Sequence, residues 1–298
     1  MSLPPDLNDR LHRSGLDPAY VARLVRDTLD EDLDGGVDVT SHATVPAEQE
    51  STMDLVARGD GVVAGILVAQ AVFEVAAGWE VTVVRSVADG DPVTRGDVIM
   101  SVTGRTRDLL TAERSALNLL CHLSGVATAT RRWADALDGT GAAVRDTRKT
   151  TPGLRALEKY AVRCGGGVNH RMSLSDAALV KDNHVLAAGG VAEAFDAVRR
   201  MWPGLPVEVE VDSLDQLAEV LDAGADLVLL DNFDVDGLRA AVALTAGRAR
   251  LESSGGLTLE SARAVAETGV DYLAVGALTH SAAVLDIGAD LRPVAGVS

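Results

Sequence analysis

The chain is poor in cysteine, in lysine and in aromatic residues, and it has no long apolar run. Its 298 residues include two cysteines, Cys121 and Cys164, and 3% aromatic residues. The cysteines lie far apart and lack metal-ligand spacing, so we expect reduced thiols in a cytoplasmic protein rather than a disulfide or a zinc site. No stretch approaches the ~20 apolar residues that cross a bilayer, and we expect no signal peptide at the N-terminus. The composition therefore predicts a soluble protein with a core of Ala, Val and Leu.

The chain also has too little positive charge to suit nucleic acid or an anionic membrane. It has 27 Lys and Arg against 44 Asp and Glu, which gives a net charge of −17, and such a field repels polyanions. Within residues 145–184, however, eight Lys and Arg stand against four Asp and Glu, so this segment is +4 and the remainder is −21. A non-enzymatic acidic interaction protein would explain the net charge but not this basic segment. The segment predicts a pocket for a small anion.

Lysine is nearly absent, with three residues against 24 arginines. All three, Lys149, Lys159 and Lys181, lie in the basic segment. Where Arg fills almost every cationic position, a retained Lys indicates a need for its compact ammonium group. We assign functions to Lys149 and Lys181. We expect Lys159, like Arg155 and Arg163, to be a solvated charge on a helix surface or loop.

The first part of the chain mixes helical and strand patterns. Apolar residues with helical spacing predict helices over 18–33, 65–77 and 108–137, while Val-rich runs predict short strands. The predicted strands cover residues 52–57, 61–64 and 80–87, and Gly and Pro turns separate further short strands over 87–104. We interpret this part as a scaffold.

The second half alternates short apolar strands with helical patterns, as β/α units around a parallel sheet do. The predicted strands are 143–147, 178–181, 207–211, 227–230, 249–253 and 272–275. Polar residues or glycines stand at or near the C-terminal end of each: Arg148 with Lys149, Lys181, Glu210, Asp231, Ser254 and Gly276. A parallel β/α barrel gathers its chemistry at these strand ends, in one mouth. The pattern therefore predicts such a barrel with its site at that end.

Two consecutive strand ends indicate a phosphate site. One runs into Ser254-Gly255-Gly256 ahead of a helix, and the next ends on Gly276-Ala277. Glycines let backbone N–H groups approach an anion, and a helix N-terminus adds its positive end. A simple helix-capping turn is the alternative for either loop taken singly. The sequence contains no GxxxxGK[ST] motif, so a P-loop nucleotide enzyme is excluded.

Acidic and basic side chains complete the predicted site. Glu210 and Asp231 follow buried strands, where carboxylates hold sugar hydroxyls or Mg²⁺, and Glu208 would point the same way as Glu210. The alternative is that these acids merely cap the next loop. Cys164 has no identifiable base partner and is rejected as a nucleophile. The cations expected around a polyanionic ligand are Arg148, Lys149, His170, Arg171 and Lys181.

Six segments, in order, resemble the quinolinate phosphoribosyltransferase family, also called carboxylating nicotinate-nucleotide pyrophosphorylase. They read DTRKTTPGLRALEKYAV (146–162), GGGVNHRMSLSDAALVKDNH (165–184), VEVEVDSLDQL (207–217), LVLLDNF (227–233), LESSGG (251–256) and GVDYLAVGALTHS (269–281). The likeness extends to TAERSALNLLCHLSGVATAT at 111–130 and so covers nearly the whole chain.

The resemblance implies an α/β fold with two domains. An N-terminal α/β sandwich would cover residues 1–120, joined by the C-terminal tail 281–298, and an incomplete parallel β/α barrel would cover 121–280. It also implies a homodimer, or a larger assembly of dimers, in which Arg114 of one subunit completes the neighbour's site. Nucleic acid and membranes are not expected partners.

The resemblance also implies a role for each matching residue. The quinolinate site would comprise Arg114, Arg148, His170, Arg171 and Lys181. The residues that handle phosphoribosyl pyrophosphate and its Mg²⁺ would be Lys149, Glu210 and Asp231, with Thr147 alongside. The 5′-phosphate would lie on Ser254, Gly255, Gly256, Gly276 and Ala277, close to His280. The directly catalytic residues would be Lys149, Lys181, Glu210 and Asp231.

The implied reaction forms nicotinate mononucleotide, pyrophosphate and CO₂ from quinolinate and phosphoribosyl pyrophosphate, a step of NAD biosynthesis. Mg²⁺ is the expected cofactor, held largely through substrate and water. One rival is a related phosphoribosyltransferase that acts on another aromatic acid. A second is a Schiff-base aldolase with Lys181 as its nucleophile, although the surrounding arginines favour anion binding.

Overall fold

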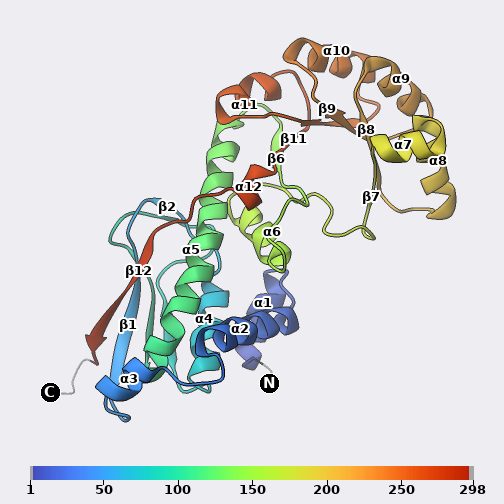
Figure 1. Ribbon diagram of the computed structural model, residues 1–298. Coiled ribbons are helices and arrows are strands. Elements are labelled where there is room, and N and C mark those ends of the chain that lie inside the picture. The colour runs from blue at the N-terminus through green and yellow to red at the C-terminus, as the bar shows by residue number, and fades with distance from the viewer. Residues whose placement is uncertain (1–2, 295–298) are drawn as a thin grey trace. The chain divides into compact units, whose positions relative to one another are not determined.

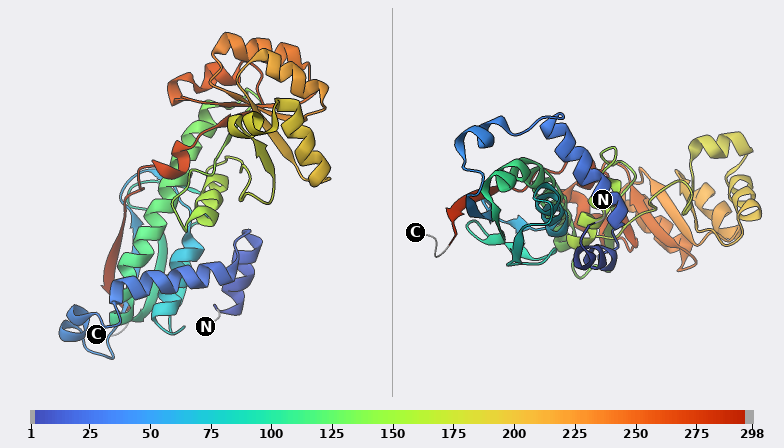
Figure 2. Two further views of the ribbon diagram at one scale, coloured as in Figure 1. Left: turned by 45° about the vertical axis from the view of Figure 1, so that its right-hand side comes forward. Right: turned by 90° about the horizontal axis from the view of Figure 1, so that it is seen from below.

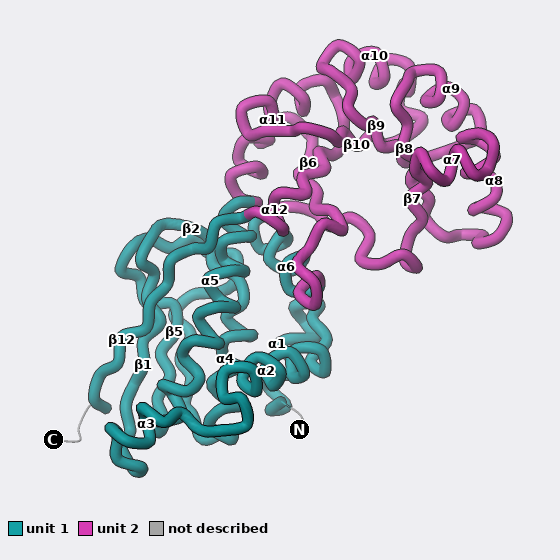
Figure 3. The backbone as a smooth tube through the Cα atoms, in the orientation of Figure 1, with its two compact units in different colours: residues 1–129, 156–166, 282–298 teal, residues 130–155, 167–281 magenta. Residues whose placement is uncertain are grey.

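The computed structural model describes residues 3–294 and divides the chain into two compact units (Figure 3). Unit 1 contains the chain up to Ala129, Ala156–Gly166 and the segment from Ala282 onward, and unit 2 contains Thr130–Arg155 and Gly167–Ser281. The expected boundary at 120/121 thus lies inside unit 1, which also takes a segment from the middle of the chain. The last four residues of the expected tail 281–298 lie outside the described residues.

Unit 1 is built on a four-stranded antiparallel sheet in the order β12-β1-β5-β3. The strands are β1 Glu50–Ala57, β3 Thr82–Arg85, β5 Val98–Arg105 and β12 Ile287–Pro293, with a separate pair β2 Gly61–Val62 and β4 Pro92–Val93. The helices are α1 Pro5–Arg13, α2 Pro18–Leu33, α3 Val39–Thr44, α4 Ile66–Ala76, most of α5 Thr106–Ala136 and most of α6 Arg155–Cys164. Because β12 pairs with β1 from Ser51 to Ala57, the segment Ile287–Pro293 belongs to the sheet of unit 1 (Figure 1).

The local sequence explains how α2 begins and ends. The Asp17 side chain accepts the Ala19 N–H at 2.9 Å, and Pro18 occupies the first helical position, where no N–H is needed. Asp34 ends the helix in the left-handed conformation, with φ 45°. The helix predicted over 18–33 is confirmed with the same bounds.

Unit 2 is a six-stranded parallel sheet in the order β6-β11-β10-β9-β8-β7. The strands are β6 Ala143–Arg145, β7 Ala178–Val180, β8 Val207–Val211, β9 Leu227–Asp231, β10 Arg250–Ser254 and β11 Tyr272–Ala274. The helices are α7 Asp182–Ala188, α8 Val191–Met201, α9 Leu214–Asp222, α10 Val235–Thr245, α11 Leu259–Ala266 and α12 Ala277–His280. Helices α8 to α11 follow one side of the sheet (Figure 2). Since β6 and β7 do not pair, these described strands form an incomplete barrel, as expected.

All six predicted strands of the second half are confirmed within about two residues at each end. The short helices α3, α7 and α12 were not predicted, because four to seven residues are too few to show a helical period. Helix α1 was also not predicted. No helix between residues 3 and 294 combines the length and apolar character needed to cross a membrane.

The prediction that Lys159 is solvated is wrong. Its exposure is 0%, and the six consecutive residues from Leu157 to Val162 of α6 are all buried. In this helix Glu158 accepts from His122 across 2.9 Å, and the Tyr160 hydroxyl donates to Asp89 at 2.6 Å. Because six consecutive residues of α6 are buried, the helix has no solvent-facing stripe there for a lysine to occupy.

Candidate active site

A cavity of about 370 Å³ opens at the C-terminal ends of the strands of unit 2. Its apolar lining comes from Leu179, Leu229 and Ala274, which stand on three different strands. Its polar lining consists of Thr147, Arg148, Lys149, His170, Arg171, Lys181, Glu210, Asp231, Glu252 and Ser254. A larger hollow of about 580 Å³ lies at the opposite strand ends, beside Val207 and Leu227, far along the strands from these residues. The convergence of charged groups, not size, therefore identifies the site.

Two arginines in the cavity carry buried donors without acceptors. Nε of Arg148 and Nε of Arg171 are buried and find no hydrogen-bond partner in the described part of the chain. Arg171 is held by a bond from Nη1 to the Ala177 carbonyl at 2.8 Å. Burial, and then the nearby Arg148, lower the pKa of the Arg171 guanidinium. Two partly buried, mutually repelling cations with unpaired donors are a pre-formed site for an anion.

Two hydrogen bonds hold the backbone of Lys149, and its side chain passes close to Gly276. Its N–H donates to Thr147 Oγ1 at 3.0 Å, and its carbonyl accepts the Thr279 hydroxyl at 2.8 Å. A Cβ on Gly276 would lie 2.8 Å from Lys149 Cδ and 3.3 Å from His280 Nε2. Gly276 therefore leaves the space through which the lysine side chain passes. This brings Lys149 to the strand end at which a phosphate loop was expected.

The loop after β10 has the features of an anion cradle. Gly255 and Gly256 have φ of +99° and +59°, and no residue between 3 and 294 accepts their N–H groups. Helix α11 is capped separately, because the Thr258 side chain accepts the Ser261 N–H at 3.3 Å. The two interpretations of this loop, a helix cap and a phosphate site, are thus compatible. Thr258 caps the helix, and the backbone N–H groups of the two glycines are left to bind a phosphate.

The two acids expected to hold sugar or Mg²⁺ end adjacent strands, β8 and β9. Glu210 Oε2 lies 2.5 Å from Lys181 Nζ, and Asp231 Oδ2 accepts from Asn232 Nδ2 at 2.8 Å. Within the described chain, no third acid, histidine or cysteine joins them in a metal-ligand cluster. The protein thus offers two hard oxygen ligands, which suits a Mg²⁺ ion that keeps water and substrate oxygens.

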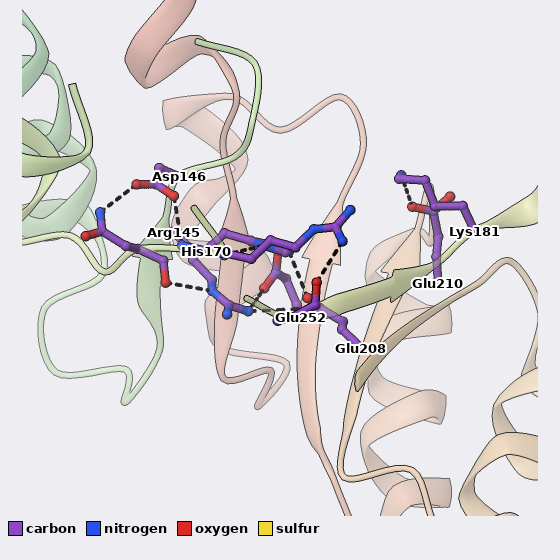
Figure 4. A network of polar contacts seen from close by, with 10 residues as sticks. Arg145, Asp146, His170, Lys181, Glu208, Glu210 and Glu252 are labelled. Atoms are coloured by element: carbon purple, nitrogen blue, oxygen red, sulfur yellow. Dashed lines mark hydrogen bonds and ion pairs between the residues drawn. The ribbon is translucent and has the colours of Figure 1, made fainter. Parts of the chain in front are cut away.

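A buried polar network adjoins the cavity (Figure 4), and the sequence pointed to His170 and Glu208 in it but not to Arg145 or Glu252 as site residues. Arg145 is hydrogen-bonded through Nη1 to Glu252 Oε2, and the same nitrogen lies 3.6 Å from Glu208 Oε1. Glu208 and Glu252 are 3% and 0% exposed. Glu252 could have been found by its spacing, because it stands two residues before Ser254 and so faces the same side of β10. Arg145 gave no signal beyond its place in the basic segment.

His170 is held in one orientation in this network. Its Nδ1 accepts the Arg171 backbone N–H at 2.7 Å, and its Nε2 lies 2.8 Å from Glu208 Oε2. The His170 N–H donates to Asp146 Oδ1 at 2.8 Å, which fixes the backbone as well. His170 therefore presents an oriented ring to the cavity and to Glu208.

The same network has the spacing of a metal site but already contains a cation. His170, Glu208 and Glu252 each offer one ligand atom within 4.8 Å of the others. The Arg145 guanidinium contacts both carboxylates and supplies the positive charge that a metal would bring. Burial, and then the neighbouring Glu208, raise the pKa of Glu252 to about 7, and burial also raises the pKa of Glu208.

The structure brings together most of the predicted site. Nine predicted residues line the cavity: Thr147, Arg148, Lys149, His170, Arg171, Lys181, Glu210, Asp231 and Ser254. Gly255 and Gly256 lie on the loop after β10, Gly276 follows β11, and Ala277 and His280 are the first and last residues of α12. Arg114 is different, because it is exposed on α5 in unit 1.

Comparison with known proteins agrees with this arrangement. The quinolinate phosphoribosyl transferase N-terminal domain model matches residues 38–124, and the C-terminal domain model matches 126–290. A carboxylating nicotinate-nucleotide pyrophosphorylase of Mycobacterium leprae is 54% identical over 271 residues, which is 90% of this chain and 95% of the relative. The NadC structure from Streptococcus pyogenes superposes with a TM-score of 0.90 at 41% identity, covering 94% of this chain and 99% of that one. The chain belongs to the quinolinate phosphoribosyl transferase family.

Proposed function

We propose that this cavity catalyses the reaction named for the relatives: the phosphoribosyl group of phosphoribosyl pyrophosphate passes to quinolinate, with loss of CO₂, in NAD biosynthesis. The observation that carries the assignment is the pair of half-buried arginines, Arg148 and Arg171, whose buried Nε donors have no acceptor among residues 3–294. A dicarboxylate would satisfy them, and Lys181 adds a third cation to the same cavity.

The charges of the cavity divide it into two parts. Arg148, Arg171 and Lys181 hold the carboxylates of quinolinate. Lys149 stabilises the leaving pyrophosphate, while Gly255 and Gly256 donate N–H groups to the 5′-phosphate. The full 5′-phosphate set also includes Ser254, Gly276, Ala277 and His280. The two parts meet where the ring nitrogen must attack the ribose carbon.

Glu210 and Asp231 orient the ribose and stabilise the positive charge that develops on it as pyrophosphate leaves. They are also the residues that would hold Mg²⁺, together with substrate and water. When bound, the ion offsets the charge of the pyrophosphate. After the nitrogen attack, the quaternised ring draws electrons from the bond to the 2-carboxylate, so CO₂ is lost without a further organic cofactor.

We further propose a homodimer in which Arg114 of each subunit completes the neighbour's cavity. In support, Arg114 is exposed and belongs to unit 1, whereas the residues that line the cavity all belong to unit 2. A cytoplasmic location is proposed from the two cysteines, both free.

One assay tests the reaction. Purified protein with Mg²⁺ and phosphoribosyl pyrophosphate should release pyrophosphate and CO₂ in equal amounts from quinolinate. Nicotinate is the matched control, since it lacks the second carboxylate and leaves buried cations unpaired, at a cost of about 1–3 kcal/mol for each lost contact. Comparable efficiency with both acids would overturn the substrate assignment. Borohydride trapping of Lys181 with a carbonyl compound would instead support an aldolase.

A further inference from the structure

The decarboxylation assigned to this cavity requires a proton donor in addition to the groups that bind quinolinate, ribose and phosphate. When the bond between C2 and its carboxylate breaks, the electron pair stays on C2, next to the quaternised nitrogen. The product carries hydrogen at that carbon. Each turnover therefore consumes one proton, and the site needs an acid that faces the ring and is recharged between turnovers.

Glu252 meets the geometric requirement. It lines the cavity, although its side chain is 0% exposed, and it stands on β10 two residues before Ser254 of the phosphate loop. Its Oε2 is hydrogen-bonded to Arg145, whereas its Oε1 is buried and finds no partner within residues 3–294. An ionised carboxylate would leave that oxygen desolvated and unsatisfied, but a protonated one turns it into a donor.

The charge balance of the network also favours a proton on Glu252. Four ionisable groups meet there: Arg145 of β6, Glu208 of β8, Glu252 of β10, and His170 of the loop before β7. The ring centre of Tyr272, on β11, lies 4.9 Å from the Arg145 guanidinium. Within the described residues, Arg145 is the one guanidinium that contacts both carboxyl groups. Two ionised carboxylates this close would repel each other, so a proton on one of them is favoured.

Of the two carboxyls, Glu252 is the one placed to hold this proton. Glu208 Oε2 faces His170 Nε2 at 2.8 Å, and that N–H stabilises the ionised form of Glu208. Glu252 Oε1 lies farther from the same nitrogen, at 4.0 Å. The pKa of about 7 for Glu252, raised first by burial and then by Glu208, agrees with this distribution.

We propose that Glu252 is the general acid that protonates C2 of the pyridine ring as CO₂ leaves. The proton passes from Oε1 of Glu252 to the carbanion, a C–H bond replaces the C–C bond, and the resulting carboxylate pairs with Arg145. Glu252 takes a new proton from solvent through the cavity after the product leaves. The inference rests on the proposed function, since it assigns an acid to the second step of that reaction.

Glu252→Gln tests the assignment, because it keeps the size of the side chain and an oxygen for Arg145 but cannot deliver a proton. Single-turnover reactions with quinolinate should be followed by two readouts, pyrophosphate release and nicotinate mononucleotide formation. Pyrophosphate release, which needs no proton, should stay close to the wild-type rate. Product formation should fall about a hundredfold or more, with the undecarboxylated nucleotide accumulating.

The other outcomes are equally distinct. An equal fall in both readouts would show that Glu252 only supports the fold of the site, and no fall in either would show that the proton comes from solvent; each overturns the proposal.

If Glu252→Gln does not fold, two measurements take its place. Product formation by the wild-type enzyme should decline as the pH rises through the pKa of Glu252, and Glu252→Asp, which keeps the acid, should retain that decline at a lower rate. If product formation does not decline as the pH rises, the proposal is also overturned. If the wild-type enzyme releases neither pyrophosphate nor CO₂ from quinolinate, the proposed function itself has failed.

Discussion

The Lys181 ammonium nitrogen lies 2.5 Å from Oε2 of Glu210, so the ends of β7 and β8 are joined by an ion pair inside the cavity. The lysine is assigned to the quinolinate carboxylates and the glutamate to the ribose. The lysine side chain is 45% exposed, which limits the strength of the pair. Glu210 nonetheless offsets part of the charge that Lys181 can offer to quinolinate.

Glu210→Gln should therefore separate binding from turnover. Quinolinate should bind up to about fivefold more tightly, as expected for removal of a competing pair worth about 1 kcal/mol or less. Turnover should fall steeply, because the ribose loses a carboxylate. Calorimetric titration of quinolinate and steady-state turnover measure the two effects. Lys181→Gln is the matched variant and should weaken quinolinate binding; weaker binding in both variants would contradict the competition.

Lys149→Ala and Arg171→Ala should affect different ligands. Lys149 stands beside Gly276 at a proposed phosphate loop, whereas Arg171 lines the cavity and has a buried, unpaired Nε. The first variant should weaken binding of phosphoribosyl pyrophosphate and the second binding of quinolinate. Each ligand should be titrated separately into each variant. Equal loss of both ligands by both folded variants would refute the division of the cavity.

Gly255→Ala should be far more damaging than Gly256→Ala. An added Cβ at position 255 would lie 2.1 Å from Asn232 Oδ1 and 3.0 Å from the Asn232 backbone nitrogen, in addition to a φ of +99°. At position 256 nothing lies within 4 Å, so only the positive φ is penalised, at about 1 kcal/mol. Urea unfolding and the KM for phosphoribosyl pyrophosphate should both change more for Gly255→Ala. Matched effects in the two variants would mean that the contact with Asn232 is unimportant.

Mixing Arg114→Ala with Lys181→Ala tests the shared site. Each homodimer should be nearly inactive. In a hybrid dimer one site lacks both residues and the other is wild type, so random reassociation should restore about a quarter of wild-type activity. Subunit exchange is checked with two affinity tags. No recovery after proven exchange would show that Arg114 does not act in the neighbour's cavity.

Glu252 should also make stability depend on pH. Its pKa is raised from 4.5 to about 7 in the folded protein, so between these values the native state holds a proton that the unfolded chain has released. The free energy of unfolding should therefore fall as the pH rises through this window, by about 1.4 kcal/mol for each unit between the two pKa values. Glu252→Gln should lack this component. Urea unfolding from pH 5 to pH 8 measures how the free energy of unfolding depends on pH in the wild-type protein and in Glu252→Gln. The same dependence in both proteins would contradict the prediction.

The sequence by itself determined the barrel and the position of its site. Strand spacing places Arg148, Lys181, Glu210, Asp231 and Ser254 at strand ends, and parallel strands present those ends on one edge whatever their order in the sheet. The scarcity of lysine pointed to Lys149 and Lys181, which both line the cavity. Such inferences need only local periodicity and the geometry common to all parallel sheets.

Only the tertiary structure decided which of these groups are buried and which meet. Arg145 and Glu252 stand on β6 and β10, separated by β11, so their pairing depends on the strand order of the sheet and not on spacing along the chain. The orientation of the His170 ring follows from the donor that faces Nδ1. Lys159 is fully buried, although the sequence favoured a solvated position. Protonation and exposure depend on neighbours that the fold brings from distant parts of the sequence, and local sequence patterns do not predict those neighbours.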